Sequence, residues 1–264
     1  MNAQNTDKIA IIQELRPIDD ILFEVLARDK AFDEEMLRLL IGDGNLRVAD
    51  VIVQSDERNL YGRSVRLDAL CTLGDGSKCN IEVQRADDDD HIRRVRYNAS
   101  MITTRESSTG TEFSKIPEVY VVYISEKDFL KGSRPIYHVE KVIRETGQTV
   151  DDGLHEIFVN TSVNDGSVIA EYMANFVKTD VDTKFPAFSN AVRTVKCTKG
   201  GHKSMCELME KYAKEYAKEE VKNSEERFAK LINKLMETER KEDLQKALED
   251  FAFRNQLYED LKIE

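Results

Sequence analysis

The sequence lacks several features that mark particular classes of protein. No run of 18 apolar residues occurs, and the opening residues MNAQNTDKIAIIQELRP have neither the basic start nor the long apolar core of a signal peptide. The four cysteines form no C-x-x-C pair, and no histidine stands at a zinc-ligand interval from them. We therefore expect a soluble cytoplasmic protein with reduced thiols, no membrane segment and no zinc site.

An excess of positive charge is also missing. The chain has 39 Lys and Arg against 50 Asp and Glu, so its net charge is -11. A protein that coats nucleic acid through its overall field needs the opposite sign, because phosphate contacts are made by Lys and Arg. Any site for a polyanion must therefore be local. No internal repeat, low-complexity tract or proline-rich linker divides the 264 residues.

The hydrophobic pattern predicts an α/β core. Apolar residues at helical spacing indicate two short helices within residues 17–42, and β-branched residues with period two then indicate three consecutive strands. Helical spacing returns before a continuous apolar run that is typical of a strand covered on both faces. These elements are the strands 48–55, 64–73 and 78–84, the helix 91–105 and the buried strand 118–125.

Two further regions complete the predicted organisation. Residues 135–143 and 155–162 resemble strands, and residues 166–180 resemble a helix. From about Lys203 the composition changes to Glu, Lys, Leu, Met and Ala, with apolar positions at three- and four-residue steps. We therefore divide the chain into an α/β domain, residues 1–202, and a helical C-terminal region, residues 203–264.

The segment RLDALCTLGDGSKCNIEVQ, residues 66–84, raises the question of where its carboxylates lie. A two-residue turn at Asp75-Gly76 would send Asp68 and Glu82 to opposite faces of the hairpin. A three-residue loop, residues 74–76, with Gly76 in the left-handed conformation would place Asp68 directly across from Glu82. The second register sorts the apolar residues onto one face and the polar residues onto the other, so we expect it.

Opposed carboxylates on neighbouring strands repel each other. Their Cβ atoms are roughly 5 Å apart, and such a pair is destabilising unless a cation intervenes or a proton is shared. Oxygen ligands suit Mg²⁺ or Mn²⁺, which keep several waters that a phosphate ester can displace. A metal held there lowers the pKa of bound water and neutralises charge on the phosphate. The pattern favours phosphodiester hydrolysis.

These motifs, in this order, resemble the PD-(D/E)XK nuclease superfamily and, more narrowly, its nuclease-type transposases and recombination-promoting nucleases. The resemblance covers roughly residues 16–180. It is carried by Asp68, the turn and Glu82-x-Gln84, by the helix with Arg94 and Tyr97, by Asp20 and Phe23 in IDDILFEVL, and by the strand in KIPEVYVVYIS.

The resemblance implies a restriction-endonuclease-like core, made of helices, a three-stranded meander, a helix and a buried strand. It also implies a DNA endonuclease that uses Mg²⁺ or Mn²⁺. The implied roles are catalysis for Asp68, Glu82 and Gln84, metal ligation for Asp68 and Glu82, and accessory functions for Asp20, Glu24, Arg94 and Tyr97.

The sequence departs from the superfamily pattern at two positions. Gln84 stands where a lysine is usual, and a glutamine can orient a water but carries no positive charge. Leu67 stands where the motif has proline. Two other functions therefore stay open beside the nuclease: a degenerate core that binds DNA without cutting it, and an interaction protein organised by its helical tail.

Other charged residues have two interpretations each. Glu24 is an accessory carboxylate or part of a solvated helix face. Residues 87–90, four aspartates, form a second metal site or, as we expect, a solvated helix cap. Arg93, Arg94 and Arg96 contact phosphates or pair with those aspartates.

The interval 187–204 contains basic residues and no acid, and it predicts a surface loop that lies along a DNA backbone or that has no ligand. Its candidate DNA-binding residues are Arg193, Lys196, Lys199 and Lys203. The apolar stripe of residues 203–264 needs a cover. The alternatives are the nuclease core and a second subunit, and we expect a homodimer through the C-terminal helices.

Overall fold

The computed structural model describes residues 3–57, 64–85, 91–110, 112–180, 182–238 and 240–263. The chain forms two compact units, an N-terminal unit, Met1–Cys206, and a C-terminal unit, Glu207–Glu264. Among the described residues, no helix is both long enough and apolar enough to cross a membrane.

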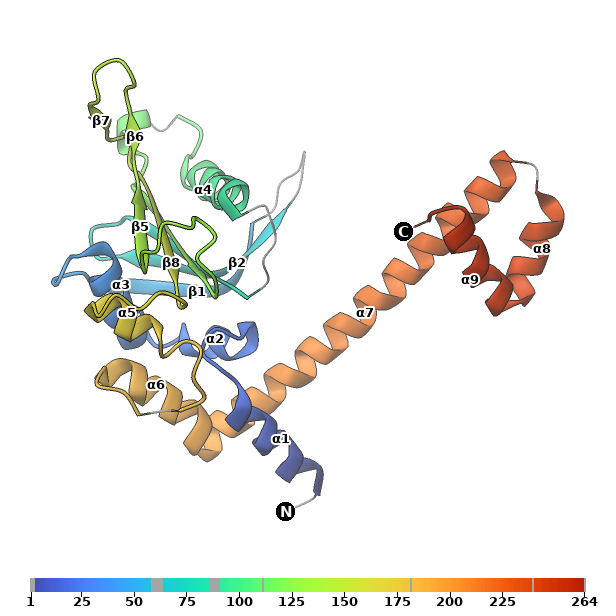
Figure 1. Ribbon diagram of the computed structural model, residues 1–264, viewed down its shortest axis with the longest axis horizontal. Coiled ribbons are helices and arrows are strands. Elements are labelled where there is room, and N and C mark those ends of the chain that lie inside the picture. Colours follow the sequence, from blue (N-terminus) through green and yellow to red (C-terminus); the bar gives the residue numbers. More distant parts are fainter. Residues whose placement is uncertain are drawn as a thin grey trace. The chain divides into compact units, whose positions relative to one another are not determined.

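A mixed six-stranded sheet is the centre of the N-terminal unit (Figure 1). The strand order is β1-β2-β3-β4-β8-β5, in which β3, β4 and β8 are parallel and the remaining pairs are antiparallel. Strands β6 and β7 form a separate two-stranded ribbon. The strands are β1 (Val48–Glu57), β2 (Val65–Leu73), β3 (Lys78–Gln84), β4 (Val119–Ser125), β5 (Ile136–Val139), β6 (Lys141–Val142), β7 (Thr149–Val150) and β8 (Leu154–Asn160).

The β2–β3 hairpin has the predicted three-residue loop. Leu73 N donates to Ser77 O over 2.8 Å, and Gly76 has a φ of 94°. This left-handed conformation is one that glycine adopts without steric cost. The pairs Cys71–Cys79 and Ala69–Ile81 then carry the register to Asp68 and Glu82, so the predicted parity is confirmed.

Helices cover both faces of the sheet. Helix α4 (His91–Glu106) lies on one face, where its Val95, Ala99 and Ile102 pack against β4. Helices α2 (Asp20–Leu26), α3 (Lys30–Ile41), α5 (Val168–Met173) and α6 (Pro186–Cys197) gather on the other face (Figure 1). The unit also contains α1 (Ala3–Glu14) and a 3-10 helix, η1 (Phe113–Lys115).

The helical layer is held together by aromatic side chains. Phe32 of α3 lies 5.4 Å from Phe188 of α6 and 6.5 Å from Phe23 of α2, measured between ring centroids. Phe176, which follows α5, contacts both Phe32 and Phe188. Edge-on and tilted rings at these spacings add to the free energy of apolar burial. These rings join α2 and α3 to α6 and to the segment after α5, which lie far later in the sequence.

The prediction of a surface loop over residues 187–204 is wrong. Helix α6 ends at Cys197, and α7 (Lys199–Glu237) begins two residues later. Gly201 permits this close junction, since a Cβ at that position would lie 2.2 Å from Thr194 O. Gly201 is therefore explained by close packing of the α7 backbone against α6.

The C-terminal unit covers its own apolar residues. The end of α7 packs with α8 (Lys241–Glu249) and α9 (Phe251–Asp260), and the buried cluster is Leu231, Leu235, Ala247, Leu257, Tyr258 and Ile263. The expectation that this stripe needs the nuclease core or a second subunit is therefore wrong for these positions. Two short helices folded back on α7 provide the cover. Tyr216, Val221, Leu248 and Phe251 stay exposed.

Candidate functional site

Asp68 and Glu82 border one cavity on the face of the sheet that α4 covers. The paired positions of β2 and β3 reach Ala69 and Ile81, and beyond them Val83 N donates to Asp68 Oδ2 over 3.1 Å. The cavity measures about 600 Å³, and we call it the carboxylate cavity. Its lining residues are Asp20, Arg66, Asp68, Glu82, Val83, Gln84, Arg85, Arg94 and Glu126.

Both carboxyl groups have raised pKa values. Burial is the main cause for Asp68, and Asp20 adds repulsion. Burial also raises the pKa of Glu82, which is only 6% exposed, and the charge of Asp68 raises it further. Asn80 Nδ2 donates to Glu82 Oε1 over 2.9 Å. The two groups resist simultaneous ionisation, as expected for neighbouring acids in a partly desolvated site.

Arg94 connects the third residue of the motif to this pair. Its Nη1 donates to Gln84 Oε1 over 3.0 Å. Its positive charge also acts to lower the pKa of both Asp68 and Glu82. Arg94, a residue of α4, therefore places a positive charge next to the neutral side chain of Gln84.

A second cavity of about 320 Å³ adjoins the carboxylate cavity along α4. The two cavities share Arg66, Glu82 and Arg94. Tyr97 and Arg93, from successive turns of α4, line only the second one. Tyr97 thus shares the second cavity with Glu82 but does not line the carboxylate cavity.

The two predicted accessory carboxylates differ in placement. Asp20, the first residue of α2, lines the carboxylate cavity, and partial burial raises its pKa. Glu24 is not among the lining residues; it is buried and forms an ion pair with Arg28 at 2.5 Å. The interpretation of Glu24 as part of a solvated face is therefore wrong. The aspartates of residues 87–90 lie outside the described residues.

The four basic candidates do not form one surface loop. Arg193 pairs with Asp182 at 2.5 Å, while Lys199 and Lys203 are exposed at the start of α7. Lys196 is only 1% exposed and donates to the carbonyl oxygens of Gln13, Leu15 and Thr179. These contacts hold the end of α1 against α6, so Lys196 has a structural role in place of the predicted contact with DNA.

The donor set of the carboxylate cavity suits a hard divalent cation. Asp68 and Glu82 offer oxygen atoms only, and a cation would relieve their repulsion. Within the described ranges, no group of three or more His, Cys, Asp and Glu side chains is arranged to hold a metal ion. Two carboxylates leave most coordination positions to water and substrate, which is usual for Mg²⁺.

Several residues of this region, among them two arginines and a glutamine, are not predicted from the sequence. Arg66 and Arg85 line the carboxylate cavity, and Arg85 is held by Asp19 at 2.9 Å. The side-chain amide of Gln54 in β1 lowers the pKa of Asp68. The pairing of β1 with β2 could have indicated Gln54, but its left-handed backbone has no signature in the sequence.

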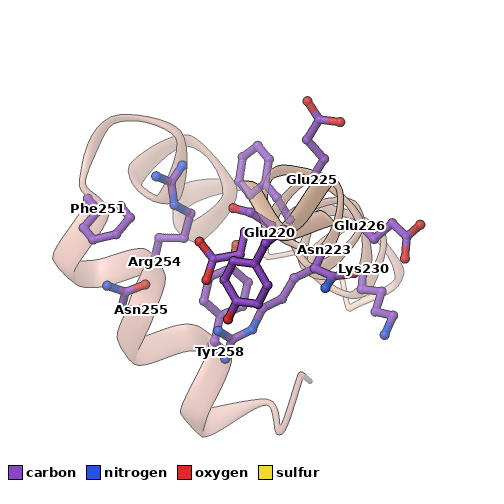
Figure 2. A pocket seen from close by; sticks show the side chains of 13 residues that line it. Glu220, Asn223, Glu225, Glu226, Lys230, Phe251, Arg254, Asn255 and Tyr258 are labelled. Atoms are coloured by element: carbon purple, nitrogen blue, oxygen red, sulfur yellow. The ribbon is translucent and has the colours of Figure 1, made fainter. Parts of the chain in front are cut away.

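A larger groove of about 880 Å³ lies in the C-terminal unit (Figure 2). Arginines stack on aromatic rings there: Arg254 lies 4.9 Å from the ring centroid of Phe228 and 5.1 Å from that of Phe251. Arg227 lies 4.2 Å from the ring of Tyr258. Mixed charges and aromatic rings make this groove chemically different from the carboxylate cavity.

Comparisons with known proteins agree with the geometry of the N-terminal unit. A family model described as PD-(D/E)XK nuclease family transposase matches residues 40–174, just over half of the chain. This stretch contains Asp68, Glu82, Gln84 and Arg94 but neither Asp20 nor the C-terminal unit. No curated protein and no solved structure matches the chain. The hairpin, the carboxylate cavity and the extent of this match lead to one conclusion: the chain belongs to the PD-(D/E)XK nuclease family transposases.

Proposed function

We propose that the protein is a metal-dependent DNA endonuclease of the transposase-associated, recombination-promoting kind, with a restriction-endonuclease-like core. The observation that carries the proposal is the convergence of Asp68 and Glu82 in one cavity beside Arg94. The family match supports a nuclease-related function. The proposed reaction is hydrolysis of a phosphodiester bond in DNA.

In this proposal Asp68 and Glu82 hold one Mg²⁺ or Mn²⁺ ion. When bound, the metal supplies Lewis-acid activation of water and of the phosphate. The amide of Gln84 orients the attacking water, and its carbonyl oxygen is fixed by Arg94. The guanidinium of Arg94 provides the positive charge that Gln84 lacks and stabilises negative charge on the phosphate. Arg66, which lines both cavities, binds the same phosphate.

Cleavage of supercoiled plasmid DNA with Mg²⁺, with Mn²⁺ and with a chelator tests this function. Asp68→Ala is the matched site variant, and Asp50→Ala is the control because Asp50 is an exposed carboxylate of β1. We expect nicking that requires metal, is lost in Asp68→Ala and is retained in Asp50→Ala. Salt-sensitive DNA binding without cleavage would support the degenerate DNA-binding alternative, and no effect on DNA would support the interaction protein.

We also propose that the protein is a homodimer that associates through its C-terminal helices. The support is local: Phe251 and Tyr216 line the groove of Figure 2 and are 67% and 68% exposed. Exposed aromatic rings beside arginines are typical of protein interfaces. Light scattering of the full chain and of Phe251→Ser tests the proposal. A wild-type monomer at micromolar concentration would contradict it, whereas a dimer that the substitution dissociates would support it.

A further inference from the structure

Gln54 has a backbone conformation that its residue type rarely adopts. Its φ is 51°, in the left-handed region, where a side chain clashes with its own backbone. The other described non-glycine residues with positive φ, Lys131, Ser133 and Lys262, lie in loops or beyond a helix end, whereas Gln54 lies within β1. A strained residue inside a strand needs an interaction that compensates for it.

The register of β1 and β2 shows what that interaction is. Val53 pairs with Ala69 and Ser55 pairs with Leu67, so Gln54 stands opposite Asp68. Directly opposed residues of antiparallel strands project from the same face of the sheet. The side-chain amide of Gln54 acts on the neighbouring Asp68 carboxylate and lowers its pKa.

Asp68 consequently has a donor group beside it on each neighbouring strand. Val83 N of β3 donates to its Oδ2 on one side, and Gln54 of β1 stands opposite it on the other. Asp20 and Glu82 face the same carboxylate with like charge, while Arg94 faces it with opposite charge. A carboxylate under repulsion from two acids keeps one orientation only if fixed donors hold it.

We propose that Gln54 is a positioning residue for Asp68. Its amide holds the Asp68 carboxylate in the orientation in which Asp68 and Glu82 share a divalent cation, and its left-handed backbone is retained for that contact. This inference rests on the proposed metal site. It adds a residue of β1, outside the hairpin motif, to the parts on which metal affinity depends.

Two substitutions separate the side-chain contact from the backbone strain. Gln54→Ala removes the amide and keeps the strain, whereas Gln54→Gly removes both. Lys131→Gly is the matched control, because Lys131 has a φ of 57° in an exposed loop and does not line the carboxylate cavity. The measurements are the dissociation constant for Mn²⁺, by isothermal titration calorimetry of the full chain, and the melting temperature without metal.

We expect both Gln54 variants to bind Mn²⁺ at least about tenfold more weakly than the wild type, the loss usual for a group that orients a ligand. We expect Gln54→Gly to melt no lower than Gln54→Ala, and Lys131→Gly to bind Mn²⁺ like the wild type. Variants of Gln54 with wild-type affinity would overturn this inference and leave the proposed function standing. A wild-type chain that binds no Mn²⁺ would overturn both.

Discussion

On the face of the sheet that α4 covers, Asp68, Glu82 and Arg94 border an open cavity. On the opposite face, Asp33 and Lys196 are enclosed by helices, with 0% and 1% of their surface exposed. Lys196 donates to three carbonyl oxygens, whereas Asp33 contacts the thiol of Cys71 and its Oδ1 has no hydrogen-bond partner.

The two faces of the sheet differ in whether water and a cation can reach their charged side chains. An enclosed group must be neutral or satisfied by the protein itself, and burial holds the pKa of Asp33 well above its usual range, so its neutral form is favoured. The carboxylates of the cavity also resist ionisation, but water and a cation can reach them. Burial of charge therefore identifies a candidate site only together with a cavity and a second charged group.

Glu82→Gln should have the largest effect. The substitution removes one charge of the pair but keeps its shape, so we expect DNA cleavage to fall by at least about 10³-fold, the upper range for removal of one electrostatic group in an active site. The fold should be retained or stabilised, because repulsion with Asp68 is relieved. Plasmid nicking and thermal melting measure the two effects. A large loss of thermal stability in metal-free buffer would indicate that Glu82 has a structural role.

Arg94→Ala should reduce cleavage by about 10²-fold, since it removes the cation beside Gln84. Gln84→Lys should retain or raise activity in the wild type, and it should restore much of the activity lost in Arg94→Ala. Rates of plasmid nicking for the two single variants and the double variant form the cycle. If Arg94→Ala lowers the nicking rate by the same factor in the wild type and in the Gln84→Lys variant, Arg94 does not supply the missing charge.

Lys196→Met should change stability and leave DNA binding intact. It leaves three carbonyl oxygens at the junction of α1 and α6 without their donor, and we expect the free energy of unfolding to fall by about 2 kcal/mol. Urea denaturation measures this loss. Lys199→Met is the control, because Lys199 is exposed. A stable Lys196→Met variant with weakened DNA binding would restore Lys196 as a DNA contact.

Asp33→Asn should remove a pH dependence of stability. The folded-state pKa of Asp33 is raised by burial and by the charge of Asp29, so its favourable contribution is present below the unfolded pKa and is lost as pH rises through the folded pKa. Cys71 and Cys79, also buried nearby, have raised pKa values and stay neutral. At pH 8 the variant should be more stable than the wild type, because the asparagine carries no charge that burial penalises. Parallel pH profiles of melting temperature for the two chains would contradict this.

The hairpin could be predicted from the sequence because its geometry is local. Residues 74–76 contain the glycine that a left-handed loop position requires, and the alternation of apolar and polar residues permits only one register. Once that register is known, the proximity of Asp68 and Glu82 follows from strand pairing alone. The carboxylate pair is thus the part of the candidate site that the sequence encodes most directly.

Long-range packing explains what the sequence did not reveal. The sequence places Lys196 with surface bases, because nothing near it in the chain indicates that carbonyl oxygens at the end of α1 surround its ammonium group. Residues 3–14 were not predicted to be helical, although α1 is fixed by that contact. The left-handed backbone of Gln54, beside Asp68, is a conformation that tertiary structure imposes. Helix α9 returns to α7 in a way that helical periodicity alone does not specify.

The central claim is that Asp68 and Glu82 form a repulsive pair that a divalent cation relieves. The melting temperature of the wild type and of Asp68→Asn, each in chelator and in excess Mg²⁺, tests it most directly. We predict that Mg²⁺ raises the melting temperature of the wild type, because a ligand of the folded state stabilises it. Asp68→Asn should melt at or above the wild-type value in chelator and should not respond to Mg²⁺. A wild type without a Mg²⁺ response, or equal responses in the two chains, would contradict the claim.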